Sequence, residues 1–231
     1  MVELIFALDV DNIEEAEPFV EIPGLEFYKV GLQLFLKEGY RVVEFLKQRE
    51  KKVFLDLKFH DIPNTVASAA RQAVRMGVDV FNIHITGGYE MVRRAVEATR
   101  DENEKMGRSS LIIGVTILTS LSQEDLERVG FSLSPKEAVI HLAKMGFEAG
   151  LDGVVCSPVE AKKIKENTSN SFLTFTPGIT LYGGSRDDQK RTMSVREAVE
   201  NGSDFLIVGR PIRNSPDPVR TVAEILRIIH G

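Results

Sequence analysis

The stretch Lys52-Val-Phe-Leu-Asp-Leu-Lys-Phe-His-Asp-Ile-Pro-Asn-Thr65 places three charged side chains at the end of an apolar run. Residues 53–55 are typical of a buried strand. Because side chains alternate between the faces of a strand, we expect Asp56 and Lys58 on one face. Charges at the mouth of an apolar strand cost desolvation free energy unless they are paired or used. With Asp61 as the third charge, the pattern indicates either a structural ion pair or a functional site.

Short apolar runs alternate with amphipathic segments along the whole chain. We expect eight strands, at residues 4–8, 27–30, 53–57, 80–85, 111–116, 153–156, 172–176 and 205–208. Apolar residues three and four apart predict helices at 40–47, 65–76, 89–106, 135–149, 158–166, 194–200 and 219–229, and a short one at 123–128. Strict alternation of strands and helices favours a parallel sheet with right-handed crossovers.

The alternation continues without a break that would divide the chain. No linker rich in Pro, Gly or Ser and no low-complexity segment interrupts it. Eight strand–helix units in 231 residues favour closure into a barrel over an open doubly wound sheet. We therefore predict an α/β fold, a single (β/α)8 TIM barrel of parallel strands over residues 1–231.

Composition narrows the classes of function. The chain is 43% apolar and 27% charged, and its net charge of −5 comes with no basic cluster. We therefore expect neither nucleic acid nor a membrane as a partner. The apolar run before Asp9 lacks the basic residues of a signal peptide and the length of a membrane span. A lone Cys156, with no Cys/His cluster at zinc-ligand spacing, suits a reducing, cytoplasmic location and predicts no metal site.

Polar side chains gather at the carboxyl ends of the expected strands. In a barrel of this type these ends meet at one rim, where active sites form. The residues are, in chain order, Asp9, Lys29, Asp56, Lys58, Asn82, His84 and the pair Thr119-Ser120. A lone His on an apolar strand is more often structural than catalytic, so we leave His84 out of the site. The cluster predicts a polar catalytic site at the rim.

The last two loops of the predicted barrel carry a phosphate-binding pattern. Barrels frequently bind phosphate with the loops after their seventh and eighth strands. The seventh loop contains Gly183-Gly-Ser-Arg186 and Gln189, and the eighth strand runs into Gly209-Arg210-Pro. Gly209 lets an anion approach the backbone, and Arg210 supplies a forked donor of permanent charge. The alternative is that Gly-Arg-Pro only forms a tight turn.

Seven short motifs, spread from one end of the chain to the other, identify a family. They are Ala7-Leu-Asp9, Lys29-Val-Gly31, Asp56-Leu-Lys-Phe-His-Asp-Ile-Pro-Asn-Thr65, Leu118-Thr-Ser120, Thr176-Pro-Gly-Ile179, Asp188-Gln189 and Val208-Gly-Arg-Pro-Ile212. On these motifs the chain resembles the orotidine 5′-monophosphate decarboxylases, carboxy-lyases of pyrimidine biosynthesis. Asp-x-Lys-x-x-Asp also occurs in the wider superfamily, but its extension to Thr65, with Lys29 on the second strand, is typical of the decarboxylases.

The resemblance implies a homodimer of barrels with shared active sites. It implies conversion of orotidine 5′-monophosphate (OMP) to UMP and carbon dioxide, with no metal and no cofactor. Four catalytic residues follow from it: Lys29, Asp56, Lys58 and, from the partner subunit, Asp61. Lys58 would protonate C6 of the pyrimidine, Asp56 would lie against the substrate carboxylate, and Lys29 would hold the array and contact the ribose.

The resemblance also implies a set of substrate-binding residues. Besides Lys29, they are Asp9, Ile62, Thr65, Thr119, Pro177, Thr180, Gln189, Gly209 and Arg210. Asp9 and Thr65 would bind the ribosyl group, and Ile62 would pack around the leaving group. Thr119 would contact the pyrimidine. The 5′-phosphate would be held by Gln189, Gly209 and Arg210, under a lid formed by residues 180–191.

One position departs from the family pattern. Bacterial relatives usually have an arginine that contacts the phosphate where this chain has Thr180. Thr180 offers a hydroxyl but no charge. Arg186, six residues further on, could reach the phosphate instead.

Two other functions stay open on the sequence alone. Sugar-phosphate decarboxylases such as 3-keto-L-gulonate 6-phosphate decarboxylase share Asp-x-Lys-x-x-Asp, but they use Mg²⁺ held partly by an acidic residue on the second strand. This chain has Lys29 there, a cation that would repel the metal. A non-catalytic nucleotide-binding dimer would be expected to have lost part of the charge array, whereas all four charges are present here.

Overall fold

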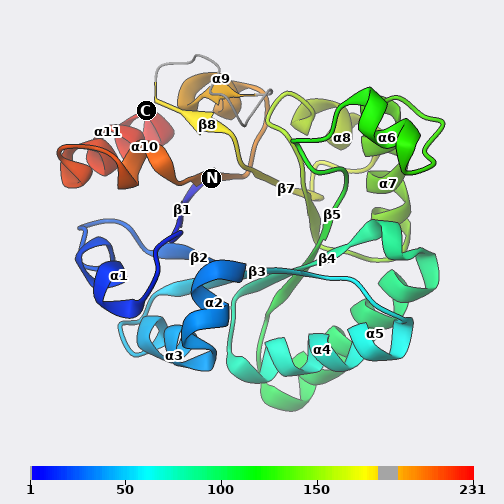
Figure 1. Cartoon of the computed structure of the whole chain (residues 1–231), viewed down its shortest axis with the longest axis horizontal. Coiled ribbons are helices and arrows are strands. Elements are labelled where there is room, and N and C mark those ends of the chain that lie inside the picture. The colour runs from blue at the N-terminus through cyan, green and yellow to red at the C-terminus, as the bar shows by residue number, and fades with distance from the viewer. Residues whose placement is uncertain (1, 182–191) are drawn as a thin grey trace.

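Parallel strands close into a barrel, and helices cover its outside (Figure 1). The computed structural model describes residues 2–181 and 192–231. Around the barrel the strands follow the order β1, β2, β3, β4, β5, β6, β7, β10, and β10 pairs back with β1. Each of these eight strand pairs is parallel. The predicted (β/α)8 barrel is confirmed.

The barrel strands lie close to the positions expected from the sequence. They are β1 (Glu3–Ala7), β2 (Phe27–Gly31), β3 (Lys52–Phe59), β4 (Val80–His84), β5 (Leu111–Val115), β6 (Gly153–Val155), β7 (Leu173–Thr176) and β10 (Phe205–Val208). β3 continues two residues beyond its expected end. A separate small sheet of β8 (Ile179–Thr180) and β9 (Met193–Ser194) was not predicted, because strands of two residues show no alternation.

Amphipathic segments form the outer layer. The predicted helices are α3 (Tyr40–Lys47), α4 (Pro63–Met76), α5 (Tyr89–Met106), α6 (Gln123–Arg128), α7 (Pro135–Glu148), α8 (Ala161–Asn167), α9 (Val195–Glu200) and α11 (Pro218–His230). α8 begins later than expected, because residues 158–160 form a turn in which Glu160 accepts the N–H of Ser157. The sequence did not predict α1 (Ile13–Val20), α2 (Leu32–Glu38), α10 (Arg210–Arg213) and the 3-10 turn η1 (Ile85–Gly87). α10 and η1, of four and three residues, are too short for apolar periodicity to be informative. α1 carries Pro18 in its interior, which argues against a helix, and α2 has consecutive apolar residues at 34–36 instead of an apolar stripe.

Apolar side chains fill the interior of the barrel. This inner layer consists of Ile5, Ala7, Phe27, Phe54, Val80, Ile113, Phe175 and Ile207. At the edge of this inner layer, Phe175 stacks on Phe205 with ring centroids 4.2 Å apart. A larger apolar cluster lies between the strands and the helices. Because alternate strand positions serve these two layers, the barrel is solid and only its ends are available for ligands.

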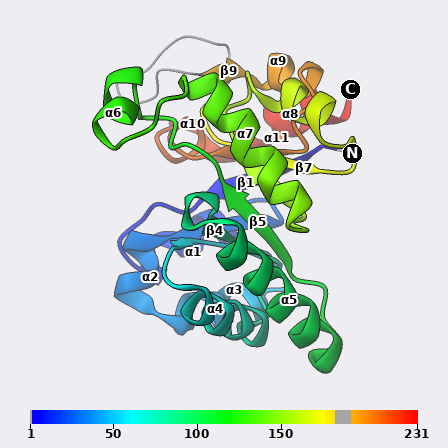
Figure 2. The same cartoon turned by 90° about the vertical axis from the view of Figure 1, so that its right-hand side faces the viewer.

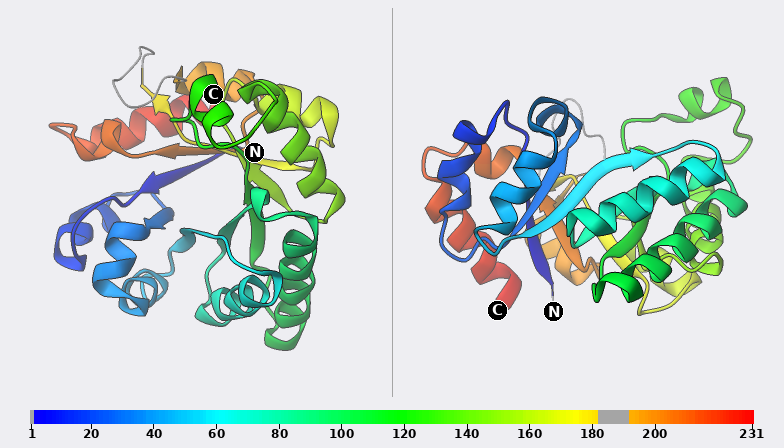
Figure 3. Two further views of the ribbon diagram at one scale, coloured as in Figure 1. Left: turned by 45° about the vertical axis from the view of Figure 1, so that its right-hand side comes forward. Right: turned by 90° about the horizontal axis from the view of Figure 1, so that it is seen from below.

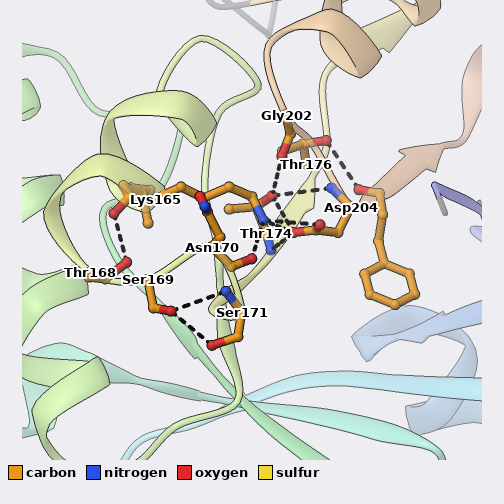
Figure 4. A network of polar contacts seen from close by, with 11 residues as sticks. Lys165, Thr168, Ser169, Asn170, Ser171, Thr174, Thr176, Gly202 and Asp204 are labelled. Atoms are coloured by element: carbon orange, nitrogen blue, oxygen red, sulfur yellow. Dashed lines mark hydrogen bonds and ion pairs between the residues drawn. The ribbon is translucent and has the colours of Figure 1, made fainter.

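A polar network ties strands together at the amino-terminal end of the barrel, and Asp204 is its centre (Figure 4). The carboxylate of Asp204, which directly precedes β10, accepts the backbone N–H of Thr174 at 2.8 Å. It also pairs with the ammonium of Lys165, from α8, at 2.8 Å. One acid therefore joins β7, β10 and a helix.

The same arrangement occurs twice more at this end. The corresponding sets are Asp79 with the N–H of Val53 and the ammonium of Lys47, and Asp152 with the N–H of Ile112 and the guanidinium of Arg100. In each set the acid precedes an even-numbered strand of the barrel, and the N–H belongs to the neighbouring strand. Such bonds fix the register of paired strands.

The opposite end of the barrel is the rim where the carboxyl ends of the strands meet. The segment between β5 and α7, which contains the predicted α6, projects there, and the two chain termini lie at the other end (Figures 2 and 3). In the part of the chain that the structure describes, none of the helices is long and apolar enough to cross a membrane.

Candidate active site

Four charged side chains form a line of ion pairs at the carboxyl-end rim. Nζ of Lys29, on β2, lies 3.2 Å from Oδ1 of Asp9 and 3.3 Å from Oδ2 of Asp56. Nζ of Lys58 lies 2.6 Å from Oδ1 of Asp56. The order Asp9–Lys29–Asp56–Lys58 alternates in sign, so each inner charge has opposite charges on both sides. We call these four residues the charge array.

The two inner members of the array are buried and the two outer members reach solvent. The side chains of Lys29 and Asp56 are 11% and 12% exposed, against 29% for Lys58 and 49% for Asp9. Burial lowers the pKa of Lys29, but the charges of Asp56 and Asp9 outweigh it and raise that pKa above its ordinary value. Burial would raise the pKa of Asp56, yet Lys29 and Lys58 hold it below its ordinary value. Both inner groups are therefore charged at neutral pH.

The backbone of β3 departs from a regular strand where it carries Lys58. Lys58 has a φ of 54°, a left-handed conformation that is uncommon outside glycine. In the pairing with β4, Leu55 lies opposite Phe81 and Phe59 opposite Ile83, so four steps along β3 match two along β4. Asp56 and Lys58 do meet as expected, but simple alternation is not the reason. A bulge, which sequence periodicity does not reveal, turns Lys58 toward Asp56.

Two adjoining cavities lie beside the charge array. The first, of about 130 Å³, is lined by Asp9 and Lys29 of the array and by Gly209, Arg210 and Pro211, among others. We call it the arginine cavity. A Cβ added at Gly209 would lie 3.2 Å from Cβ of Ala7, so a side chain at this position would crowd the cavity wall. The structure thus places Gly209 and Arg210 together with the acidic end of the array.

The second cavity, of about 150 Å³, contains the other end of the array and is called the lysine cavity. Its polar lining includes Lys29, Asp56, Lys58 and Thr119. The rest of the lining is largely apolar: Phe54, Val115, Ile117, Leu118, Val155, Cys156, Pro177 and Ile207. The two cavities share Lys29, Pro177 and Ile207. The array therefore runs along the boundary between a cationic compartment and a mainly apolar one.

Three of the predicted site residues do not line either cavity of their own chain. Asp61, Ile62 and Thr65 all lie exposed just after β3, where α4 begins, and Ile62 is 68% exposed. The carboxylate of Asp61 accepts the backbone N–H of Ile62 at 2.7 Å. All three residues therefore lie on the surface of their own chain, outside both cavities.

The predicted phosphate residues around the seventh loop are only partly described. Thr180 is buried in the small β8–β9 sheet and lines the arginine cavity, and its hydroxyl lies 3.3 Å from the carbonyl oxygen of Met193. Pro177 lines both cavities. Gln189 and Arg186 fall outside the described residues, so their predicted contacts stay predictions.

Several residues near the site were not selected from the sequence. The apolar lining of the lysine cavity includes Val155 and Cys156, which occupy strand ends as ordinary core residues do, and burial raises the pKa of the Cys156 thiol well above its usual range. Arg213 donates a hydrogen bond to the backbone carbonyl of Asp9.

His84 packs on His60 with ring centroids 5.2 Å apart and lines neither cavity. Among the described residues, no group of three or more His, Cys, Asp or Glu could hold a metal ion.

The fold and the site together define a class of protein: a (β/α)8-barrel enzyme whose site lies at the carboxyl ends of the strands. A sequence model described as "Orotidine 5′-phosphate decarboxylase / HUMPS family" matches residues 2–225. The chain therefore belongs to this family of carboxy-lyases and related enzymes.

Individual relatives agree with the family assignment. The chain is 44% identical over 226 residues to an orotidine 5′-phosphate decarboxylase from Geotalea daltonii, covering 97% of this chain and 94% of the relative. It is 46% identical over 211 residues to one from Carboxydothermus hydrogenoformans, covering 90% and 88%. The solved structure of orotidine 5′-phosphate decarboxylase from Lactobacillus acidophilus is 35% identical, covers both chains completely, and superposes with a TM-score of 0.89.

Proposed function

We propose that this protein is an orotidine 5′-phosphate decarboxylase that converts OMP to UMP and carbon dioxide without a metal or an organic cofactor. In the reaction the bond between C6 and the carboxylate breaks, and its electron pair stays on C6. A proton from the ammonium of Lys58 then forms the new C6–H bond, and solvent reprotonates the amine. The observation that carries the proposal is the charge array at the boundary of the two cavities.

Fixed charge is the chemistry that this reaction needs. The departing carbon dioxide leaves electron density on a ring carbon that has no carbonyl positioned to delocalise it. A preorganised ammonium can stabilise that density and then protonate it. Lys58 meets both requirements, because Asp56 holds its Nζ at 2.6 Å and its side chain remains 29% exposed at the lysine cavity. Asp56 would lie against the substrate carboxylate.

The two cavities suit the two ends of a mononucleotide. Each is smaller than the roughly 300 Å³ of a typical ligand pocket, so a nucleotide would occupy both. The 5′-phosphate would lie beside Gly209 and Arg210, and the pyrimidine in the mainly apolar lysine cavity beside Thr119. Lys29 and Asp9, between them, would contact the ribose. Binding free energy from the phosphate, which is remote from C6, can then be used to organise the reacting groups.

The position of Lys29 supports a reaction without a metal. Its ammonium lies between the carboxylates of Asp9 and Asp56, within 3.3 Å of each. A divalent ion bound by these two acids would have to displace that ammonium or tolerate its charge. This feature favours OMP decarboxylation over the Mg²⁺-dependent reaction of sugar-phosphate decarboxylases.

A direct assay tests the proposal. We expect the purified protein to convert OMP to UMP, followed by ultraviolet absorbance, with the same rate before and after prolonged treatment with EDTA. A rate that falls with EDTA and returns with Mg²⁺ would favour the sugar-phosphate chemistry. Absence of turnover together with binding of UMP would favour the non-catalytic alternative.

The proposal includes a homodimer in which each site borrows residues from the partner copy, with the whole chain as one catalytic unit in the cytoplasm. The exposure of Asp61, Ile62 and Thr65 supports it, and so does the 81% exposure of the apolar Leu36. Mixing the inactive variants Lys58→Ala and Asp61→Ala should restore activity, because one site of a mixed dimer then contains both Lys58 and Asp61. No recovery after subunit exchange, or a monomeric mass in solution, would contradict the shared site.

A further inference from the structure

Asn82, on β4, binds two parts of β3 with one side chain. Its Nδ2 donates a hydrogen bond to Oδ1 of Asp56 at 2.7 Å. Its Oδ1 accepts the backbone N–H of Lys58 at 2.8 Å. Asn82 is 1% exposed, and neither cavity includes it in its lining. A single buried amide therefore bonds to both residues at the Lys58 end of the charge array, Asp56 and Lys58.

The bonds of Asn82 lie where the regular pairing of β3 and β4 is interrupted. The register shifts between Leu55 and Phe59, and Lys58 adopts its left-handed φ of 54° within that interval. A residue other than glycine keeps a left-handed conformation only when the surrounding structure enforces it. The amide oxygen of Asn82 supplies the acceptor for the Lys58 N–H at this point and so opposes a return to regular pairing.

The two partners of Asn82 allow only one orientation of its side-chain amide. The ionised carboxylate of Asp56 can only accept, so it must face the NH₂ of the amide; the backbone N–H of Lys58 can only donate, so it must face the oxygen. Aspartate at this position would offer no donor to Asp56, and leucine would offer neither group. The network is complete only with a side-chain amide.

The geometry points to Asn82 as a positioning residue that fixes the Lys58 ammonium relative to the Asp56 carboxylate, an inference that rests on the proposed function. Asn82 holds the backbone of Lys58 and the carboxylate that pairs with its Nζ, so the amine has little freedom left. The competing interpretation is that Asn82 is only a satisfied polar group in the core, which would affect stability alone.

Kinetics of Asn82→Leu and Asn82→Asp separate these interpretations. We expect kcat to fall about 100-fold in both variants, as for loss of one preorganised donor. KM and the Kd of UMP should change less than about threefold, because Asn82 does not line the cavities. Thr174→Val is the matched control: it removes buried hydrogen bonds to Gly202 and Asp204 at the amino-terminal end, and should lower stability while leaving kcat unchanged.

The pH dependence of kcat/KM also separates the two interpretations, because a purely structural role for Asn82 would leave it unchanged. The groups facing Asp56 are Lys29 on β2, Lys58 on β3 and Asn82 on β4, and all three favour its ionised form. Loss of the Asn82 bond raises the pKa of Asp56, so the acid limb of kcat/KM should move to higher pH in Asn82→Leu. His84, also on β4, senses Asp56 and Lys58, so His84→Gln is measured in parallel to show that the moved limb belongs to Asp56.

Hydrogen exchange tests the inference without substrate. The amide of Lys58 should exchange slowly in the unliganded wild-type protein and at least tenfold faster in Asn82→Leu and, if that variant fails to fold, in Asn82→Ser. Unchanged exchange, or an unchanged kcat and acid limb in a folded variant, would overturn the positioning role. Wild-type protein that protects the Lys58 amide but does not turn over OMP would instead contradict the proposed function.

Discussion

At the amino-terminal end of the barrel, Asp204 accepts the backbone N–H of Thr174 and forms an ion pair with Lys165. At the carboxyl-end rim, by contrast, Asp56 contacts three side chains, two of them lysines. The acid at the amino-terminal end is matched by one cation, and its bonds join two strands and a helix. At the rim, acids and cations alternate along a line that opens on two cavities.

The difference shows how the same residue types serve two purposes. At the amino-terminal end, a carboxylate that accepts a backbone N–H fixes strand register, and its contribution is to stability. At the rim, Asp9 and Lys58 stand at the ends of the array with 49% and 29% of their side chains exposed. Burial keeps the inner pair in place, and the partly exposed ends remain available to a ligand. Substitutions at the two ends should therefore separate activity from stability.

The largest expected effect is at the rim. Lys58→Ala should lower kcat/KM by at least about 10⁴-fold, since it removes both the proton donor and the charge that stabilises the carbanion. Calorimetric binding of UMP and the thermal unfolding temperature should stay close to wild type, because the variant removes a partly exposed side chain. Residual activity within tenfold of wild type would show that Lys58 is not the donor.

A smaller loss is expected from a substitution in the arginine cavity. Arg210→Ala should lower kcat/KM by about 10²–10³-fold, the scale of losing charge-assisted hydrogen bonds to a phosphate. Arg220→Ala is the matched control, because it removes the same charge from an exposed position on α11. Steady-state kinetics of both variants check this, and equal kinetics in the two would remove Arg210 from the phosphate site.

Substitutions at the amino-terminal end of the barrel should change the stability of the protein and leave its activity unchanged. Asp152→Ala removes the acceptor for Ile112 and the partner of Arg100, and should lower the free energy of unfolding by about 2–3 kcal/mol. Asp152→Asn keeps an oxygen for the N–H of Ile112 and should cost less. Denaturant titration measures both, and kcat/KM per folded molecule should equal that of the wild type. A variant that is stable but slow would mean that the two ends are coupled.

The smallest expected effect comes from adding one methyl group beside the charge array. A Cβ at Gly31 would lie 3.1 Å from Nζ of Lys29, so Gly31→Ala should displace the ammonium by a few tenths of an ångström and lower kcat about tenfold. Gly39, at the other end of α2, has a φ of 58° and no heavy atom within 4 Å of an added Cβ. Gly39→Ala should therefore lower the unfolding temperature and leave kcat unchanged. A Gly31→Ala variant with wild-type kcat would show that catalysis tolerates displacement of the Lys29 ammonium.

Local patterns in the sequence were sufficient for most of the fold. Every barrel strand was anticipated, because apolar runs of four to six residues between amphipathic segments have few other structures open to them. Of the elements that were missed, α10 and the two strands of the β8–β9 sheet contain too few residues for a period to register, and α2 has consecutive apolar residues at 34–36 instead of an apolar stripe. The lining of the candidate site was anticipated where a strand ends in charge, as at Asp56. It was missed where the lining is apolar, as at Val155, because such residues look the same in a core and in a cavity.

By itself the sequence determined the alternating strands and helices, the polar strand ends and the motifs that define the family, since these depend on residues close together in the chain. Only the tertiary structure decided that Lys58 turns toward Asp56 through a bulge, that Asn82 holds both, and that Asp61 lies outside the cavities of its own chain. These features depend on register between strands and on contacts between distant segments. A one-residue shift in register would reverse which side chains meet, and the order of residues along the chain does not encode that shift locally.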